Sequence, residues 1–263
     1  MSDSALSPAS RKASLARIAA GERFDVVVVG GGITGVGIAL DAASRGLSVA
    51  LVEAGDIAGG TSSRSSKLIH GGLRYLEMLD FGLVREGLSE RRLLRTRIAP
   101  HLVRPVPFLF PLRHRFWERP YLGSGLLLYD AMGGARHLPR SRHLSKRAAL
   151  ASAPALRPDS LVGAVRFYDC QEDDALYAAY VARTAAAQGA AIVTRARVTG
   201  FTRDESGRVT GVSVAGPAGE LTLRARHTVS AAGVGSDRLL ELATGEPQTA
   251  LRPSKGVHLM VPR

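Results

Sequence analysis

Four glycines and one carboxylate occur at a spacing that suits dinucleotide binding. The segment Gly30-Gly31-Gly32-Ile33-Thr34-Gly35 has the glycine spacing of a pyrophosphate-binding turn, and Glu53 follows Gly35 by eighteen positions. Gly30 permits a tight turn, Gly32 lets the backbone approach a pyrophosphate, and Gly35 lets a helix pack closely on a strand. Glu53 can accept hydrogen bonds from an adenosine ribose, and its charge disfavours the 2′-phosphate of NADP. These residues predict a dinucleotide site, with FAD and NAD both open.

The residues around this turn have the pattern of the strand, helix and strand that must position it. Residues 25–29 form an apolar β-branched run typical of a strand buried on both faces. Residues 37–43 continue as a helix that ends at Arg45-Gly46, and residues 48–52 form a second strand that ends in Glu53. A glycine-rich turn alone is weak evidence, since other α/β proteins contain similar turns. The flanking strands and the acid favour the dinucleotide site.

A second motif combines hydroxyl, cationic and glycine residues. It reads Thr61-Ser62-Ser63-Arg64-Ser65-Ser66-Lys67-Leu68-Ile69-His70-Gly71-Gly72-Leu73-Arg74-Tyr75-Leu76-Glu77. A flexible serine-rich linker has no need of the close-packed part over 67–75. The string resembles the segment of FAD-dependent glycerol-3-phosphate dehydrogenases that lies along the flavin, and the resemblance extends over residues 24–263. It implies FAD rather than NAD, and oxidation of sn-glycerol 3-phosphate to dihydroxyacetone phosphate with electrons passed to quinone or another acceptor.

The resemblance implies a cofactor site built from several segments. The glycine turn would contact the pyrophosphate, and Glu53 and Ala54 would contact the adenosine. The hydroxyl-rich run would lie along the ribityl chain and the edge of the flavin. The backbone of Val198 would meet the adenine, and Ala232 with Gly233 would close the floor. The implied cofactor residues are Gly30, Gly31, Gly32, Thr34, Gly35, Glu53, Ala54, Thr61, Ser62, Ser63, Ser66, Lys67, Leu68, Ile69, Val198, Ala232 and Gly233. Several relatives carry a bulky aromatic soon after that last glycine, where this chain has Val234-Gly235, so the resemblance does not define this wall of the pocket.

The implied reaction needs a base and a phosphate-binding group. A secondary alcohol loses a hydride only as a base takes the hydroxyl proton, and a histidine suits that task near neutral pH. His70 is the candidate base; the alternative is a histidine that only packs or bonds against the flavin. Arg74 and Tyr75 would hold the phosphate or hydroxyls of the substrate, since guanidinium binds phosphate through two hydrogen bonds. Lys255, in the resembling segment Lys255-Gly256-Val257-His258, would complete the anionic pocket.

No metal site is expected. The other candidate ligands lack metal-ligand spacing and read as solvated surface residues; they are His101, His114, His137 and His143. The single cysteine, Cys170, rules out an internal disulfide framework and is predicted to be a small buried apolar residue in a protein of the reducing cytoplasm.

The predicted fold class is α/β. We expect a Rossmann-like FAD-binding domain of three layers, with a mostly parallel sheet and an antiparallel crossover hairpin, plus a partial substrate or cap domain. The chain is predicted to begin with a polar N-terminal tail over 1–23, which contains a short helix around 10–20. A discontinuous FAD-binding domain follows over 24–79 and 161–245, interrupted by a cap or substrate insertion over 80–160. Residues 246–263 are predicted to be the start of a truncated substrate domain. Because relatives continue well beyond this point, we expect a fragment that by itself is poorly soluble, binds FAD weakly and does not turn over glycerol 3-phosphate.

Within these domains the prolines and the β-branched residues set further expectations. Prolines at 100, 105, 107 and 111 predict an extended, turn-rich stretch. Residues 209–214 and 220–226 predict a hairpin around the turn at 216–219. Residues 227–233 predict a separate strand that follows this hairpin.

The charge of +12 comes almost entirely from arginine, since the chain has only four lysines. Such a balance suits an anionic partner, but no nucleic-acid-binding pattern accompanies it, so no nucleic acid is expected. No apolar run is long enough to span a bilayer. The segment 112–121 interleaves cations with aromatics, and Leu126-Leu127-Leu128-Tyr129 is apolar. These residues could rest on an anionic leaflet or form a solvated cap surface, and the resemblance favours peripheral contact of a cytoplasmic protein with the cytoplasmic face of the membrane.

Three function classes stay open. The first is a flavin dehydrogenase of glycerol 3-phosphate, with another flavin oxidoreductase of amino or hydroxy acids as its nearest rival. The second is a non-catalytic flavin-binding fragment. The third is an NAD-dependent dehydrogenase, which gives no role to residues 61–75.

Overall fold

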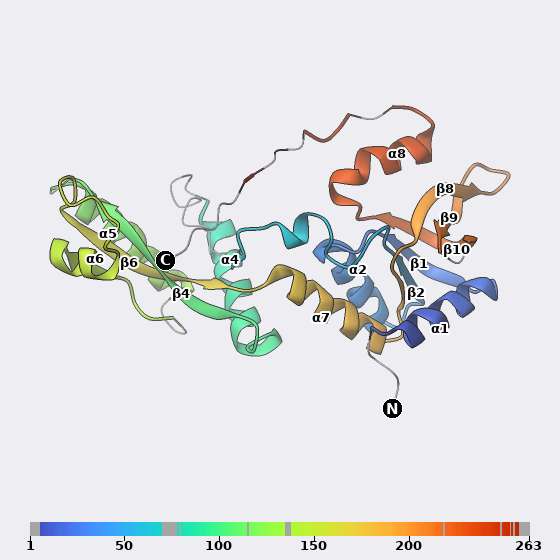
Figure 1. Ribbon diagram of the computed structural model, residues 1–263, viewed down its shortest axis with the longest axis horizontal. Helices are drawn as coiled ribbons and strands as arrows, with labels where there is room; N and C mark the ends of the chain where they lie inside the picture. Colours follow the sequence, from blue (N-terminus) through green and yellow to red (C-terminus); the bar gives the residue numbers. More distant parts are fainter. Residues whose placement is uncertain are drawn as a thin grey trace. The chain divides into compact units, whose positions relative to one another are not determined.

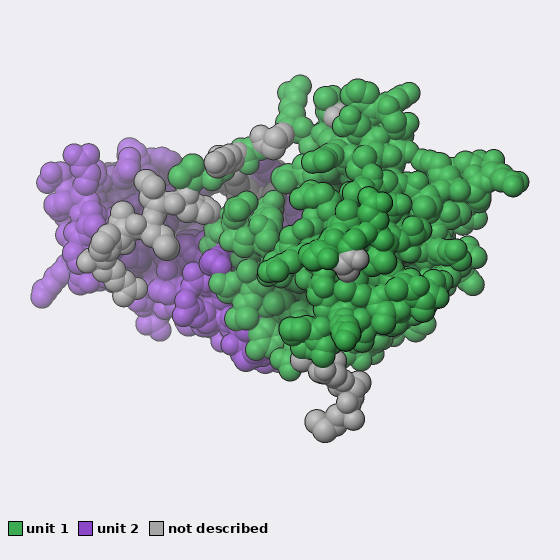
Figure 2. Space-filling model, turned by 45° about the vertical axis from the view of Figure 1, so that its right-hand side comes forward, with its two compact units in different colours: residues 1–66, 173–263 green, residues 67–172 purple. Residues whose placement is uncertain are grey.

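The computed structural model describes residues 6–69, 78, 80–114, 116–134, 138–217, 219–247, 249–252, 254 and 256–257. The chain forms two compact units, residues 1–66 with 173–263 and residues 67–172 (Figure 2). The predicted domain boundaries stay a prediction; residues 67–79 and 161–172, assigned above to the FAD-binding domain, belong to the second compact unit.

The first unit contains a six-stranded sheet in the order β7-β2-β1-β10-β9-β8 (Figure 1). The strands are β1 (Arg23–Val29), β2 (Val49–Val52), β7 (Ala191–Val193), β8 (Arg197–Arg203), β9 (Val209–Gly216) and β10 (Gly219–Ser230). Four neighbours, β7, β2, β1 and β10, run parallel, whereas β8, β9 and β10 form an antiparallel meander. The predicted α/β class with a mostly parallel sheet and a crossover hairpin is confirmed.

Strand β10 belongs to both parts of this sheet. Its first half pairs antiparallel with β9, from Gly219 to Arg224, and its second half pairs parallel with β1, up to Ser230 opposite Val29. The sequence predicted two separate strands here, divided between residues 226 and 227. They are one strand because β9 and β1 pair with its two halves, and residues 220–230 contain no glycine or proline that would interrupt the ladder.

Helices cover both faces of this sheet. Helices α2 (Ile33–Ser44) and α7 (Asp174–Ala187) pack on one face through small residues, which lets them approach the sheet and each other closely. The side chains of β1 alternate, so that Val28 faces these helices while Val27 and Val29 belong to the core on the other face. The first unit therefore has the expected three layers.

Helix α1 (Pro8–Ala19) contributes to that second face. Ile18 is buried in the core, Arg11 donates through Nη2 to the carbonyl of Thr194 at 3.0 Å, and Arg17 donates through Nη1 to the carbonyl of Gly189 at 3.0 Å. The sequence predicted a polar tail with a short helix around 10–20; the helix is present, and it is packed on the sheet through Ile18 and Leu15 together with the two arginine hydrogen bonds.

The second unit is built on an antiparallel sheet in the order β3-β6-β4, with β5 also paired to β6. Its elements are β3 (Leu68–Ile69), α4 (Phe81–Leu93), η2 (Leu94–Ile98), β4 (Arg104–Leu112), α5 (Glu118–Tyr129), η3 (Asp130–Gly134), β5 (Arg142–Ser145), α6 (Lys146–Ser152) and β6 (Gly163–Gln171). Pro100 lies in a turn over residues 100–102, as predicted, but no turn interrupts the stretch with the other three prolines, since β4 is a continuous strand. Pro105, Pro107 and Pro111 share one parity on an edge strand, so the intervening residues keep their N–H groups for β6.

A buried ion pair joins α4 to β6. The guanidinium of Arg91 contacts Asp169 Oδ1 and donates to the hydroxyl of Tyr129 at 2.9 Å, and all three residues are almost fully buried. Cys170, next in β6, is buried as predicted, and burial raises the pKa of its thiol.

Candidate functional site

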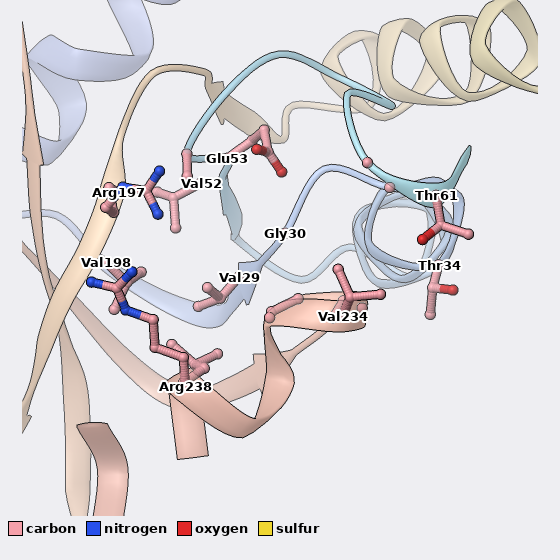
Figure 3. Close-up of a pocket in the computed structure, with 18 of the residues that line it drawn as sticks. Val29, Gly30, Thr34, Val52, Glu53, Thr61, Arg197, Val198, Val234 and Arg238 are labelled. Carbon is pink, nitrogen blue, oxygen red and sulfur yellow. The ribbon is translucent and has the colours of Figure 1, made fainter. Parts of the chain in front are cut away.

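A cavity of about 690 Å³ opens in the first unit where the carboxyl ends of β1 and β2 face the end of β10 (Figure 3). Its walls come from the glycine turn, the loop after β2, the start of β8 and the segment after β10, which forms the short helix η4 (Gly233–Gly235) and then α8 (Ser236–Thr244). Ligands of open α/β sheets bind at this edge, outside the carboxyl ends of the strands. The cavity is therefore the candidate site of the first unit.

The glycine turn has the close backbone contacts that its sequence predicted. Gly30 has φ +116°, a conformation that side chains rarely adopt, and a Cβ there would collide with the carbonyl of Ala231. A Cβ at Gly35 would collide with the carbonyl oxygen of Gly30. The first glycine thus permits the turn, and Gly35 lets α2 begin directly against it.

The N-terminus of α2 faces the cavity with hydroxyl groups around it. The helix begins at Ile33, and its N-cap residue Gly32 has no side chain to cap the free N–H groups. Ser62, in the short helix η1 (Thr61–Ser63), accepts a hydrogen bond from the N–H of Ile33 at 2.9 Å. Thr34 and Thr61 lie at the same end of the cavity (Figure 3). The helix dipole, the free N–H groups and these hydroxyls form a binding site for an anion.

Glu53 is held between two backbone N–H groups. Its Oε2 accepts from Gly31 at 2.6 Å and its Oε1 accepts from Gly55 at 2.6 Å. The backbone of Glu53 is fixed as well, because its N–H donates to Val193 at 2.9 Å and its carbonyl accepts from Ala196 at 2.8 Å. A carboxylate has about four acceptor positions. Glu53 therefore has acceptor capacity left for the hydroxyls of a ribose in the cavity.

These features fit the adenosine diphosphate part of FAD. The glycines remove the side chains that would block a pyrophosphate, the helix N-terminus offers N–H groups to it, and Glu53 is an oriented acceptor for the ribose. The apolar wall beside Glu53 includes Val29, Val52 and Val198, a suitable surface for a purine base.

Most of the predicted cofactor residues of the first unit line this cavity. They are Gly30, Gly32, Thr34, Glu53, Ala54, Thr61, Ser62, Val198, Ala232 and Gly233. Gly31 and Gly35 shape the turn behind it, while Ser63 and Ser66 lie in or after η1 without lining it. Lys67, Leu68 and Ile69 belong to the second unit, and their role at the cofactor site stays a prediction.

The predicted catalytic residues lie outside the described residues. These are His70, Arg74, Tyr75 and Lys255, whose roles stay predictions from the resemblance.

Three arginines that the sequence did not single out also line the cavity. Arg197 precedes Val198 in β8, Arg238 lies in α8, and Arg252 follows it in the chain. The signal for Arg197 was its position beside Val198, which places its backbone near the cavity but does not fix the direction of its side chain. Arg238 had none, since α8 itself was not predicted. Val234, where several relatives carry a bulky aromatic nearby, lines the cavity, and its side chain is largely exposed.

Comparison with known proteins identifies the family. Residues 25–263 match the family model described as FAD dependent oxidoreductase. The chain belongs to this family of FAD-dependent oxidoreductases. Membership confirms FAD as the cofactor and the predicted fold, and it removes the NAD-dependent alternative.

Similar proteins agree with the resemblance noted from the sequence. The chain is 52% identical over 262 residues to "Glycerol-3-phosphate dehydrogenase" of Mycobacterium leprae, covering 99% of this chain and 44% of that protein. It is 42% identical to "Probable glycerol-3-phosphate dehydrogenase, mitochondrial" of Caenorhabditis elegans, covering 96% of this chain and 36% of that protein. The solved structure of a glycerol-3-phosphate dehydrogenase from Bacillus halodurans complexed with FAD matches with a TM-score of 0.68 and 30% identity, covering 89% of this chain and 39% of that one. The chain thus spans less than half the length of these relatives.

Proposed function

We propose that the protein containing these residues oxidises sn-glycerol 3-phosphate to dihydroxyacetone phosphate, with FAD as cofactor and a quinone or another compound as the final electron acceptor. The observation that carries the proposal is the 52% identity over 99% of the chain to a protein named glycerol-3-phosphate dehydrogenase. The dinucleotide cavity supports the cofactor part of it.

The described residues would bind and orient the cofactor. Glu53 would accept from the ribose hydroxyls, and the N-terminus of α2 with Thr34 and Thr61 would hold the pyrophosphate. When bound, FAD supplies the oxidant for an alcohol. The proposed substrate contacts stay with the residues implied by the resemblance, His70 as the base and Arg74, Tyr75 and Lys255 as ligands of the phosphate or hydroxyls.

Anaerobic reduction of the flavin tests this proposal. Purified full-length protein that contains these residues, loaded with FAD, is mixed with sn-glycerol 3-phosphate, with glycerol, and with a panel of amino and hydroxy acids, and the visible flavin bands are followed. We expect bleaching with sn-glycerol 3-phosphate and little with glycerol, which lacks the phosphate. Bleaching by an amino acid instead would favour the rival oxidoreductase, and a bound flavin that no compound reduces would favour the non-catalytic alternative.

A substitution at the proposed base refines the test. His70→Ala should retain the flavin but slow its reduction about a hundredfold or more, the usual contribution of a positioned general base. Arg74→Ala should instead raise the substrate concentration required, because a phosphate contact stabilises substrate and transition state alike. Reduction of the His70→Ala flavin at the parent rate would mean that the base is another residue.

We also propose peripheral contact with an anionic membrane, on the cytoplasmic side. Residues 67–172 contain eighteen Lys and Arg against nine Asp and Glu, so this unit carries +9 of the total charge of +12. On α5, Trp117, Tyr121 and Leu128 share one helical face and are 58%, 56% and 42% exposed, and Phe116 just before it is 87% exposed. Cations together with exposed aromatics are typical of interfacial binding. Within the described part of the chain, no helix is long and apolar enough to cross a membrane.

Sedimentation with lipid vesicles tests the membrane proposal. We expect binding to vesicles that contain anionic lipid, weaker binding to neutral vesicles, and loss of binding in the double variant Trp117→Ser and Tyr121→Ser. Phe110→Ser is the matched control, because Phe110 is 46% exposed but lies on β4 rather than α5. Equal binding of the double variant and the parent would contradict the assignment of this surface.

A further inference from the structure

The cavity has a polar end and an end formed by apolar residues and guanidinium groups. Thr34 and Thr61 mark the polar end, beside the N-terminus of α2 (Figure 3). At the opposite end, the side chain of Arg238 extends from α8 towards Val198 on β8, and Glu53 lies between the two ends in this view. In a dinucleotide the ribose lies between pyrophosphate and base. With pyrophosphate at the helix and ribose at Glu53, the adenine therefore falls at the end where Arg238 lies.

Arg238 has a free guanidinium at this position. Among the described residues it forms no ion pair or hydrogen bond, and the carboxylate in the cavity wall, Glu53, already accepts from two backbone N–H groups. The neighbouring wall consists of aliphatic side chains, including Val52, Val198 and Leu239. A planar cation opposite an aliphatic wall forms a slot in which a flat aromatic ring can be held on both faces.

The helix that carries Arg238 is attached at both ends. Its N-terminus follows directly from the short helix η4, which lines the cavity floor. Near its C-terminus, the guanidinium of Arg203 on β8 donates to the carbonyls of Ala243 and Gly207. Asp237 accepts from the N–H of Leu251 at 3.1 Å. These contacts hold Arg238 over the cavity rather than leaving it on a loose segment.

We propose that Arg238 covers the adenine ring of FAD, stacking its guanidinium on the base opposite Val52 and Val198, and that it thereby selects adenine-containing ligands. This role rests on the proposed flavin site and adds to it a positioning residue contributed by α8. Its contribution comes from the flat face of the guanidinium as well as from its charge, so that lysine would be a poor substitute.

The test measures ligand affinity rather than turnover. Parent protein, Arg238→Ala and Arg238→Lys are titrated with FAD, with ADP, which shares the adenosine diphosphate part, and with FMN, which lacks the adenosine. Arg224→Ala is the matched control, since Arg224 is an exposed arginine of β10 outside the cavity. Melting temperatures of all variants are recorded to establish that each is folded.

We expect Arg238→Ala to weaken FAD and ADP binding by the same factor, about threefold to thirtyfold, the usual contribution of a cation–π contact. FMN binding should be unchanged, Arg238→Lys should recover little, and Arg224→Ala should match the parent. Unchanged ADP affinity in Arg238→Ala, or full recovery in Arg238→Lys, would overturn the stacking role. Failure of the parent to bind FAD would instead refute the proposed flavin site, and this inference with it.

Discussion

Replacement of Glu53 by glutamine tests whether one carboxylate both holds the loop after β2 and binds the ribose. Each oxygen of Glu53 accepts one backbone N–H at 2.6 Å, from Gly31 and from Gly55. Glutamine has one acceptor oxygen and one donor group, so its NH2 would face one of these N–H donors and leave it unpaired. Hydrogen bonds to charged groups contribute about 1.5–3 kcal/mol, and we take the lower value of about 1.5 because Glu53 is partly exposed.

This value predicts two measurable effects. For a folded unit of this size, about 1.5 kcal/mol corresponds to a decrease in Tm of roughly 3–6 °C. FAD affinity should fall by about tenfold, since the ribose also loses a charged acceptor. Glu53→Arg, which has no acceptor at all, should abolish retention of FAD during gel filtration.

Thermal unfolding followed by circular dichroism, together with FAD titration, measures both effects. Asp56→Asn is the control, because Asp56 lies on the same loop outside the cavity and, within the part of the chain that the structure describes, its Oδ1 accepts only from the adjacent N–H of Ile57, at 2.8 Å. The control should keep the FAD affinity of the parent. A Glu53→Gln protein with the Tm and FAD affinity of the parent would refute both roles of the carboxylate.

Four further substitutions test the packing and electrostatics of the two units. Gly35→Ala should abolish FAD binding and lower the Tm, because its Cβ would collide with a backbone carbonyl. Gly37→Ala in the same helix should instead raise stability by about 0.4–1 kcal/mol, since nothing lies within 4 Å of the added Cβ. Equal Tm values of the two variants would contradict this. Arg91→Met should cost about 3–5 kcal/mol, measured by denaturant unfolding, because it removes the cation that pairs with the buried carboxylate of Asp169. Hydrogen bonds from Ser48 hold the pKa of the Asp25 carboxyl below its ordinary value of 3.8. The charged carboxylate therefore stabilises the fold above that pH, and this stabilisation is lost as the pH falls through the pKa of Asp25 in the folded state. The stability difference between the parent and the corresponding asparagine variant should therefore be constant near neutral pH and disappear in acid; a difference that persists there would show that the charge is not its source.

The local elements around the cofactor site could be predicted because adjacent residues determine them. The glycine spacing, the β-branched run before it and the acid after the second strand are local patterns, and each has a steric or electrostatic reason that needs no distant residue. The positive φ of Gly30 and the close approach of Gly35 to the turn follow from that spacing. Ser145 and Asp173 cap α6 and α7 in the structure, and serine and aspartate are favoured at such positions by equally local hydrogen bonds.

Other features depend on partners that are distant in the sequence. Pro105, Pro107 and Pro111 are tolerated within β4 because this strand lies at an edge and pairs with β6, a position that the residues themselves do not encode. Strand β10 became continuous because two different neighbours, β9 and β1, pair with its two halves. The place of α1 on the sheet was likewise decided by carbonyls nearly two hundred residues away in the chain, such as that of Thr194.

The sequence by itself predicted a dinucleotide cofactor and the glycine turn expected to meet its pyrophosphate, because glycine sterics and the charge of Glu53 act over a few residues. Only the tertiary structure decided which side chains line the end of the cavity beside Val198. Arg197 and Arg238 reach it from β8 and α8, elements that meet only when the crossover strands fold back against β1. Such a meeting depends on strand pairing and helix packing across the whole unit, and no local pattern reports it.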